Sequence, residues 1–302
     1  MQSNLKNYLY LSLIIIIWGS SFAMMHACLD GGYFTPEQTV GYRLALGSFV
    51  LLVACIICKK SFPKTLTPWI HFFIYSLIGN IVPFLLISRG QMHITSGMTG
   101  LLMAFVPLVT MVLAHMFLPN NSLNRYKIIG FVLGISGVLF ILEPSIHDGG
   151  NTLFGILLIL GAASFYATHG VVVEKLPKYD PLVAATCSSI LACFLAFLIW
   201  PDMIHLNMAI IPLNTLLNML ALGVLVTGLG AIIFFNLINN AGAAFLSNMN
   251  YVIPVYAFTL GALVLGEPVL WQNMLALVLI VFGIFISRKK IKSQKLRFNN
   301  ER

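Results

Sequence analysis

Residues 214–237 read NTLLNMLALGVLVTGLGAIIFFNL, and this stretch decides the fold class. It lies within 203–266, a run of 64 residues that contains no Asp, Glu, Lys or Arg. A helix rises about 1.5 Å per residue, so about 20 apolar residues cross the hydrocarbon core of a bilayer. The run is continuously apolar rather than alternating, and backbone groups find no water partner in lipid, which favours a helix over a strand. We therefore expect residues 214–237 to form a transmembrane helix.

The whole chain has the composition of a polytopic membrane protein. Of its 302 residues, 59% are hydrophobic and only 9% are charged, whereas about 25% of an ordinary soluble domain is charged. This scarcity of charge excludes a soluble enzyme, a nucleic-acid-binding module and a disordered protein. Ten transmembrane helices are predicted, at 8–28, 36–58, 69–88, 96–117, 127–143, 153–173, 181–200, 214–237, 244–265 and 269–287. The predicted fold class is therefore an all-α integral membrane protein.

The basic residues indicate how the chain is oriented in its membrane. With ten spans and both termini in the cytoplasm, 15 of the 17 Lys and Arg residues fall in cytoplasmic segments, as the positive-inside rule requires. Seven of them lie between Arg288 and Arg302, where we interpret them as a topology anchor rather than a nucleic-acid site. The predicted location is a bacterial plasma (inner) membrane, with the lipid bilayer as a partner and no nucleic acid.

No catalytic or cofactor motif is present in the sequence. It contains no GxxxxGK[ST] nucleotide loop, no HExxH zinc motif, and no Asp or Glu near the middle of any predicted span. The five cysteines lie in or at the ends of spans, and the Cys55–Cys58 pair has no second pair nearby, so packing is favoured over metal or redox chemistry. We therefore expect no enzyme activity, no catalytic residue, no metal and no cofactor.

The chain contains an internal repeat. Pro107 pairs with Pro254 at an offset of 147 residues, and Asn80 pairs with Thr227 at the same offset. Further pairs follow in the same order at slightly shorter offsets, namely Ser21-Phe22 with Ser164-Phe165, His26 with His169, and Pro36 with Pro181. Each match is weak alone, and their common order along the chain is what indicates a repeat.

The repeat divides the chain into two halves, 1–147 and 148–302, with five predicted spans in each. Because five is an odd number, the second half enters the membrane in the opposite orientation to the first. Inverted repeats of this kind are typical of transporters, whose binding site lies near the bilayer midplane between the halves.

Short motifs mark corresponding places in the two halves. They are Trp18-Gly19-Ser20-Ser21-Phe22, Pro36, Tyr42-Arg43-Leu44, Gly97-x-x-Gly100 and Pro107 in the first half, and Ser247, Pro254 and Gly266-Glu267 in the second. With these motifs each half resembles an EamA domain of the drug/metabolite transporter superfamily, over residues 8–288. Asn120 is a departure, because it stands where that family usually has Glu. The resemblance implies ten helices, a central cavity and alternating-access transport of small metabolites, often amino acids.

Polar and aromatic side chains near the middle of spans are the candidates for substrate contact. Those predicted to bind substrate are Trp18, Ser21, Asn80, Tyr166, Ser247, Asn250 and Tyr251. The resemblance implies that the first, third and fourth helices of each repeat wall the cavity, which is where Trp18, Asn80 and the residues of span 244–265 lie. The alternative for each residue is interhelical hydrogen bonding or packing.

Four ionisable residues are candidates for gating or charge pairing. Arg43 is the one cation well inside a span, and burying it costs roughly 2.5–3.5 kcal/mol on insertion scales, so it needs a partner. That partner is either a carboxylate of the substrate or a structural group. Glu267 is expected to accept hydrogen bonds from the first amides of the last helix. The repeat-related His26 and His169 either couple transport to protons or pack structurally.

These observations predict a secondary transporter that moves a small polar metabolite across the plasma membrane by alternating access. An amino acid or a related compound is the favoured substrate, and export is favoured over uptake. One alternative is a nucleotide-sugar or nucleotide-type exchanger of the same superfamily, and alternatives from other classes are an intramembrane enzyme and a scaffold. Gly130-x-x-x-Gly134 is a close-packing motif that serves either the monomer or a homodimer.

Overall fold

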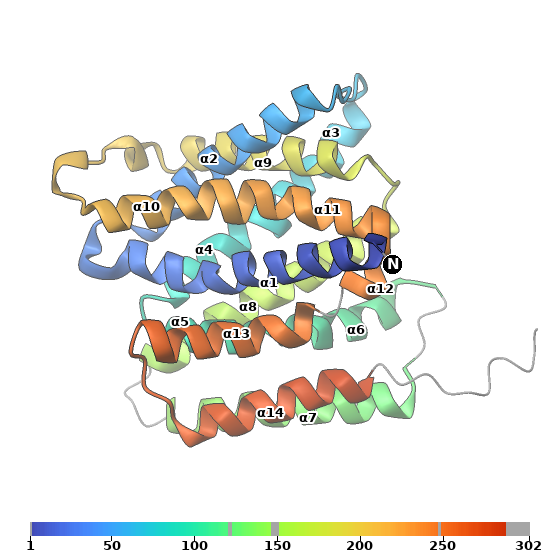
Figure 1. The fold of residues 1–302 in the computed structure, drawn as a ribbon, viewed down its shortest axis with the longest axis vertical. Helices are drawn as coiled ribbons and strands as arrows, with labels where there is room; N and C mark the ends of the chain where they lie inside the picture. Colours follow the sequence, from blue (N-terminus) through green and yellow to red (C-terminus); the bar gives the residue numbers. More distant parts are fainter. Residues whose placement is uncertain (1, 120–122, 146–150, 247–248, 288–302) are drawn as a thin grey trace, which may run out of the picture.

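The computed structural model of the protein describes residues 2–119, 123–145, 151–246 and 249–287. Throughout these residues the regular elements are helices, so the predicted all-α class is confirmed. Ser247 and Asn120, which the sequence singled out, lie outside the described residues. Figure 1 shows the helices packed side by side as one bundle, with α7 and α14 together at one edge.

The first half contributes the helices up to α7. They are α1 (Gln2–Leu29), α2 (Pro36–Ile57), α3 (Leu66–Ser76), the π-helical segment η2 (Leu77–Ile81), α4 (Val82–Gly90), α5 (Ser96–Met103), α6 (Val106–Phe117) and α7 (Arg125–Ser145), with the short 3-10 turn η1 (Asp30–Gly32) between α1 and α2. The elements α3, η2 and α4 follow one another without a break and form one membrane span, Leu66–Gly90.

The second half repeats this order. Its elements are α8 (Asn151–Lys175), α9 (Pro181–Ile199), the 3-10 turns η3 (Pro201–Ile204) and η4 (Met208–Ile210), α10 (Leu213–Ala221), the π-helical segment η5 (Leu222–Leu229), α11 (Gly230–Ala241), α12 (Ala243–Leu246), α13 (Met249–Val264) and α14 (Trp271–Ser287). Here α10, η5 and α11 form one continuous span, as α3, η2 and α4 do in the first half.

Each of the ten predicted spans overlaps a helix or successive helices of the described residues. Eight runs within the described residues are long and apolar enough to cross a membrane, and α13 and α14 are shorter apolar helices of 16 and 17 residues. The chain is therefore an integral membrane protein. The stretch 214–237 lies entirely within the run Leu213–Leu237.

The helix pair α2 and α9 demonstrates that the halves are inverted. The two helices begin at the repeat-related Pro36 and Pro181, and they pack against each other. Near the start of α2, Gln38 Nε2 donates to the carbonyl of His205, which follows the end of α9, at 3.2 Å. Repeat-related helices thus run antiparallel, with the start of one beside the end of the other.

The other end of the same pair is closed by an ion pair. Just after α2, Lys60 Nζ lies 2.7 Å from Asp180 Oδ2, and Asp180 caps the first amides of α9 with its other oxygen. Partial burial alone would raise the pKa of this carboxyl, but the bonds from Lys60 and from the helix amides outweigh it and lower the pKa below its ordinary value.

The two π-helical segments occupy equivalent places in the repeat. Asn80 lies in η2 and Thr227 lies in η5, and these are the two residues that pair at an offset of 147. A π-helical turn carries wider i to i+5 hydrogen bonds and is found mostly at functional sites. In η5, for example, the following residue Gly230 donates its N–H to the carbonyl of Leu225. The repeat therefore preserves a local irregularity as well as the order of the helices.

Gly130 and Gly134 pack inside the chain. A Cβ atom on Gly130 would collide with the carbonyl oxygen of Gly283 on α14, and one on Gly134 would collide with the side chain of Leu108 on α6. Side-chain-free surfaces let two helices approach closely in a membrane. This contact answers the question that the motif left open, because both glycines serve the packing of one molecule. A homodimer stays a prediction without support from this motif.

Candidate substrate site beside the π-helical segment η5

Two consecutive residues of η5 hold side chains from the first half of the chain. The indole Nε1 of Trp18, on α1, donates to the carbonyl of Val226 at 3.2 Å. The guanidinium Nε of Arg43, on α2, donates to the hydroxyl of Thr227 at 2.9 Å. The same hydroxyl donates to the carbonyl of Leu222 at 3.0 Å, so its direction is fixed. The segment therefore joins α1 and α2 to the second repeat.

Glycine residues allow α2 and η5 to come this close. A Cβ atom on Gly47 of α2 would collide with the side chain of Thr227. In the same way, a Cβ on Gly223 would meet Leu46, and a Cβ on Gly228 would meet Val50 at 2.6 Å. Three small residues on the facing surfaces thus bring the Thr227 hydroxyl within reach of Arg43.

Arg43 is buried without an acidic partner. Arg43 is only 8% exposed, and its guanidinium carbon lies 3.8 Å from the centroid of the Phe84 ring on α4. Tyr166, on α8, packs against Phe84 with the ring centroids 6.5 Å apart. Among the described residues no carboxylate lies within 4 Å of the guanidinium. The acidic residue closest in sequence, Glu37, instead pairs with Arg89 at 2.7 Å.

Trp18 and Ser21 lie on α1, but only Trp18 contacts the second half through its side-chain polar group. The Trp18 ring also packs against Phe234 on α11, with centroids 5.3 Å apart. Ser21 donates to the backbone carbonyl of Trp18 at 2.6 Å, a bond within its own helix. A neighbour that the sequence analysis did not select, Ser20, lies 3.2 Å from the hydroxyl of Tyr256 on α13.

Asn80 lies in η2, the π-helical segment of the first half, and His169 of α8 packs against the same segment. A Cβ on Gly79 would lie 2.8 Å from His169 Nε2, so the α8 ring packs directly on η2. The ring of Tyr75 lies 5.4 Å from the His169 ring in an edge-on contact. Asn80 is half-buried, and its amide makes no hydrogen bond within the described part of the chain. Such an amide is free to bind a ligand or water.

His26 lies at the other end of the molecule from His169. It precedes the end of α1, which leads through η1 into the start of α2, whereas α8 ends near Asp180 at the opposite end of the α2–α9 pair. The Nδ1 atom of His26 is enclosed and has no hydrogen-bond partner among the described residues. The two repeat-related histidines therefore do not share a site.

The predicted residues of α13 differ in their surroundings. The Tyr251 hydroxyl donates to the carbonyl of Ile284 at 3.5 Å, so its ring extends toward α14. Asn250 is half-buried and, within the described residues, forms no hydrogen bond through its amide. The Trp18 indole thus donates to η5, whereas the Tyr251 hydroxyl donates to α14.

Glu267 caps α5, and the expectation that it caps the last helix is wrong. One carboxylate oxygen accepts from the backbone N–H and the hydroxyl of Ser96, both at 2.7 Å, and the other accepts from the N–H of Gly97 at 2.8 Å. The physical reason is the preceding turn. Gly266 adopts a positive φ of 66°, which turns Glu267 back across the end of α13 so that its N–H reaches the carbonyl of Gly261 at 3.1 Å.

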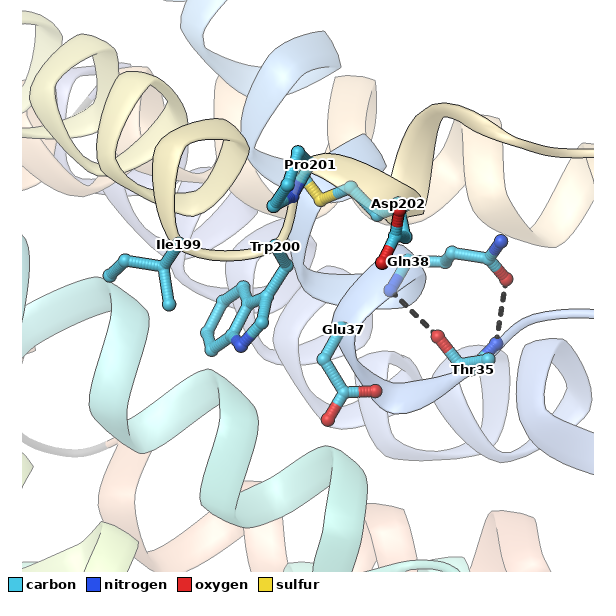
Figure 2. Close-up of a pocket in the computed structure, with 8 residues that line it drawn as sticks. Thr35, Glu37, Gln38, Ile199, Trp200, Pro201 and Asp202 are labelled. Carbon is cyan, nitrogen blue, oxygen red and sulfur yellow. Dashed lines mark hydrogen bonds between the residues drawn. The ribbon is translucent and has the colours of Figure 1, made fainter.

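A pocket of about 260 Å³ opens at the end of the molecule where α2 begins and α9 ends. Figure 2 shows Trp200 and Asp202 from the second half facing Glu37 and Gln38 from the first. Its lining residues are Thr35, Glu37, Gln38, Ile199, Trp200, Pro201, Asp202 and Met203. Met203 lies at the base, because it also packs in the apolar cluster with Val40 and Leu44. Along α2, the pocket residues Glu37 and Gln38 precede Arg43 by six and five residues, which is one to two helical turns.

Sequence reasoning missed two residues of this region, Thr227 and Phe84. Thr227 carried a signal, because it pairs with Asn80 in the repeat, yet it was not selected as a site residue. Phe84 carried no signal, since an apolar aromatic residue in an apolar span is ordinary. Only the packing of α4 against α2 brings its ring over Arg43.

Inverted repeats of helices with irregular backbone at mid-span are an architecture found in many membrane transporters. Within that class the chain belongs to the EamA-like transporter family, whose family model matches residues 5–143 and 153–288. The resemblance drawn from the motifs is thereby confirmed.

Relatives of the same length support this assignment. An uncharacterized transporter of Archaeoglobus fulgidus is 24% identical over 95% of this chain and 100% of its own length. A probable amino-acid metabolite efflux pump of Salmonella typhimurium is 24% identical over 91% of this chain and 92% of its own. A protein of known crystal structure, 18% identical, aligns with a TM-score of 0.64 over 94% of this chain and 97% of the other. The last likeness concerns the fold.

Proposed function

We propose that the protein is a secondary transporter that exports a small polar metabolite, an amino acid or a related compound, across the plasma membrane by alternating access. The observation that carries this proposal is the junction at η5, where Val226 and Thr227 of one repeat bind Trp18 and Arg43 of the other. A site made by both repeats is the place where a movement of one repeat against the other can change access to a substrate.

The chemistry of this region suits a small metabolite. The proposed contacts include the aromatic rings of Trp18 and Tyr166, and the amides of Asn80 and Asn250, which form no hydrogen bond within the described residues, would supply neutral hydrogen-bonding groups. Arg43 is the single cation deep within a span of the described chain, whereas a nucleotide or nucleotide sugar needs several cations for its phosphates. This disfavours the exchanger alternative. The name of the Salmonella relative supports an amino-acid-related substrate and export.

The substrate contacts that we propose are the predicted ones. They are Trp18, Ser21, Asn80, Tyr166, Ser247, Asn250 and Tyr251, with Arg43, His26, His169 and Glu267 as gating or charge-pairing residues. We place the boundary between the two halves of the sequence at residues 147 and 148. Both termini face the cytoplasm of a bacterial cell. The orientation is supported by Lys60, because its ion pair lies at the end of the α2–α9 pair where Lys59 and Lys178 also occur.

Counterflow in proteoliposomes tests this function. The purified protein is reconstituted into liposomes loaded with one amino acid, and entry of the same labelled amino acid is followed for all twenty in turn. We expect accumulation of at least one of them, above protein-free liposomes and without ATP. The absence of accumulation for every amino acid would contradict the proposed substrate. A requirement for ATP would contradict secondary transport.

A further inference from the structure

Within the described residues, the buried guanidinium of Arg43 has no acidic partner. We infer that Arg43 is the counter-ion of the transported metabolite, so that the substrate class is a carboxylate-bearing compound whose carboxylate binds the guanidinium. This inference rests on the proposed function, since it names the group by which that site selects its substrate.

The structure holds the guanidinium in place through only part of its surface. Its Nε donates to Thr227 Oγ1 at 2.9 Å, and one face covers the Phe84 ring at 3.8 Å. Neither contact uses the two terminal nitrogens, which form no hydrogen bond within the described residues. The terminal N–H groups of Arg43 therefore remain available to a ligand.

Among the described residues, no negative charge compensates the positive charge of Arg43. The nearest acidic residue along α2, Glu37, is paired with Arg89. The ionisable groups that interact electrostatically with the guanidinium are the Tyr166 phenol and the Cys28 thiol, and both types are neutral near pH 7 in ordinary surroundings. A buried cation is costly in a membrane, so a bound anion would stabilise this state.

The shape of the group favours a carboxylate. The terminal nitrogens of Arg present parallel N–H groups that match the two oxygens of a carboxylate, which a Lys ammonium cannot do. The second repeat adds no second guanidinium at the corresponding place, because the residue seven positions after Pro181 on α9 is Ser188. One guanidinium suits a group with a single negative charge better than a phosphate chain.

The place of Arg43 also suits a transport site. It lies seven residues after Pro36, about 10 Å along α2 from the outer end of the helix. The pocket of Figure 2 is lined by Glu37 and Gln38, which precede Arg43 by six and five residues along the same helix. Since Thr227 belongs to the second repeat, a movement of the repeats would also change the surroundings of the guanidinium.

Ligand-induced thermal stabilisation of the full-length protein in detergent tests the inference. The probes are the twenty amino acids and the carboxamides of leucine, phenylalanine and threonine, in which the carboxylate is replaced by a neutral amide. We expect an amino acid of these pairs to bind the wild type about tenfold to a hundredfold more tightly than its amide, as the loss of a charged hydrogen bond requires. Equal binding of acid and amide, or no stabilisation by any probe, would overturn the inference.

Variants distinguish recognition from a structural role. Arg43→Gln should reduce the preference for acid over amide to within about threefold, and Arg43→Lys should keep part of it. Arg89→Gln is the matched control, since it removes an exposed arginine of the outer ion pair and should leave the preference unchanged. An Arg43→Gln variant that keeps the full preference would show that Arg43 is structural. If Arg43→Gln does not fold, the test rests on the acid and amide affinities of the wild type and of Arg43→Lys. An Arg43→Lys variant that binds the amino acid as tightly as the wild type would overturn bidentate binding of the carboxylate.

The two proposals can fail separately. Transport of an amino acid and its amide at equal rates would leave the proposed function intact and overturn the role of Arg43. Carboxylate binding that depends on Arg43, without any accumulation in proteoliposomes, would support the recognition and contradict transport.

Discussion

Thr227 links an irregular backbone segment to a buried charge. Its hydroxyl donates along the π-helical segment to Leu222 and accepts from Arg43, so both of its hydrogen-bonding directions are used. The residue at the equivalent place in the other repeat, Asn80, has an amide with no hydrogen bond inside the described chain. Each repeat therefore has a polar residue at the same place. Thr227 binds Arg43, whereas the Asn80 amide forms no hydrogen bond within the described residues.

Trp18 gives a prediction at the residue scale. Trp18→Ala removes the bond to Val226 and the packing on Phe234, and transport should fall a few-fold to about a hundredfold at equal membrane abundance. Asn250→Ala and Tyr251→Phe should have smaller effects, because each removes one neutral contact. The measurement is the initial rate of counterflow.

The control for Trp18 is Trp271→Ala. Trp271 is 64% exposed at the start of α14, far along the chain from η5, and its loss should leave the rate unchanged. Normal transport by all three site variants would place the substrate elsewhere. Failure of these variants to accumulate in the membrane would assign the residues to packing.

Glu267 gives a second prediction at the same scale. Glu267→Gln keeps the shape but removes the charge and turns one acceptor into a donor opposite an amide of α5, which should cost about 1–3 kcal/mol of stability. Thermal unfolding in detergent measures the change. Glu37→Gln is the comparison, because its partner Arg89 is more than half exposed and such pairs contribute about 0–1 kcal/mol. Equal losses in the two variants would show that the cap of α5 has no special weight.

At the scale of the elements, close contacts between helices depend on glycine. The α7–α14 pair at the edge of Figure 1 meets where Gly130 faces Gly283. The α2–η5 contact likewise depends on Gly47, Gly223 and Gly228. In lipid, where the hydrophobic effect does not drive helices together, such close approach provides the van der Waals contact that holds them.

Gly130→Ala tests this contact. The added methyl group collides with the backbone of α14, and overpacking of this kind should destabilise the protein by about 1–3 kcal/mol. Gly170→Ala on α8 is the matched control, since nothing lies within 4 Å of the added carbon. It should be neutral or stabilising by up to about 1 kcal/mol, because Ala favours helices over Gly. Both changes are read from thermal unfolding, and equal effects would contradict the close contact.

At the scale of the whole molecule, inversion of the repeats fixes which loops lie together. The Lys60–Asp180 pair marks one end, and the bond between Gln38 and His205 marks the other. Because basic residues gather at the first end, that end is expected to face the cytoplasm.

Reporter fusions test this orientation. Fusions that should report the cytoplasm follow Lys64, Arg125, Lys178 and Arg288, and fusions that should report the outside lie at Gly32, Asp148 and Asp202. A protein with the opposite orientation would reverse every reading. A missing or additional span would reverse the readings of all fusions that follow that span in the chain. Reversal at two or more of these places would reject the ten-span topology.

The fold of this protein could be predicted from its sequence because the bilayer imposes one dominant constraint. Uncharged runs long enough to cross the membrane must be helices, so the stretch 214–237 and its counterparts determined the class and the span positions. Basic residues between the spans indicated an orientation, and ordered matches such as Asn80 with Thr227 revealed the repeat. These signals are local, or depend only on order along the chain, and need no knowledge of which helices touch.

The site could be predicted only in part, because side-chain partners depend on helix rotation and packing. The sequence identified Arg43 as a cation inside a span but could not reveal Phe84 over its face or Thr227 as its anchor. It predicted that Glu267 caps a helix but assigned the wrong one. The turn at Gly266 carries the carboxylate to α5, 170 residues away along the chain. Hydrophobicity specifies where a helix crosses the membrane, whereas the neighbours of each polar group are decided by the tertiary packing of glycine-lined surfaces.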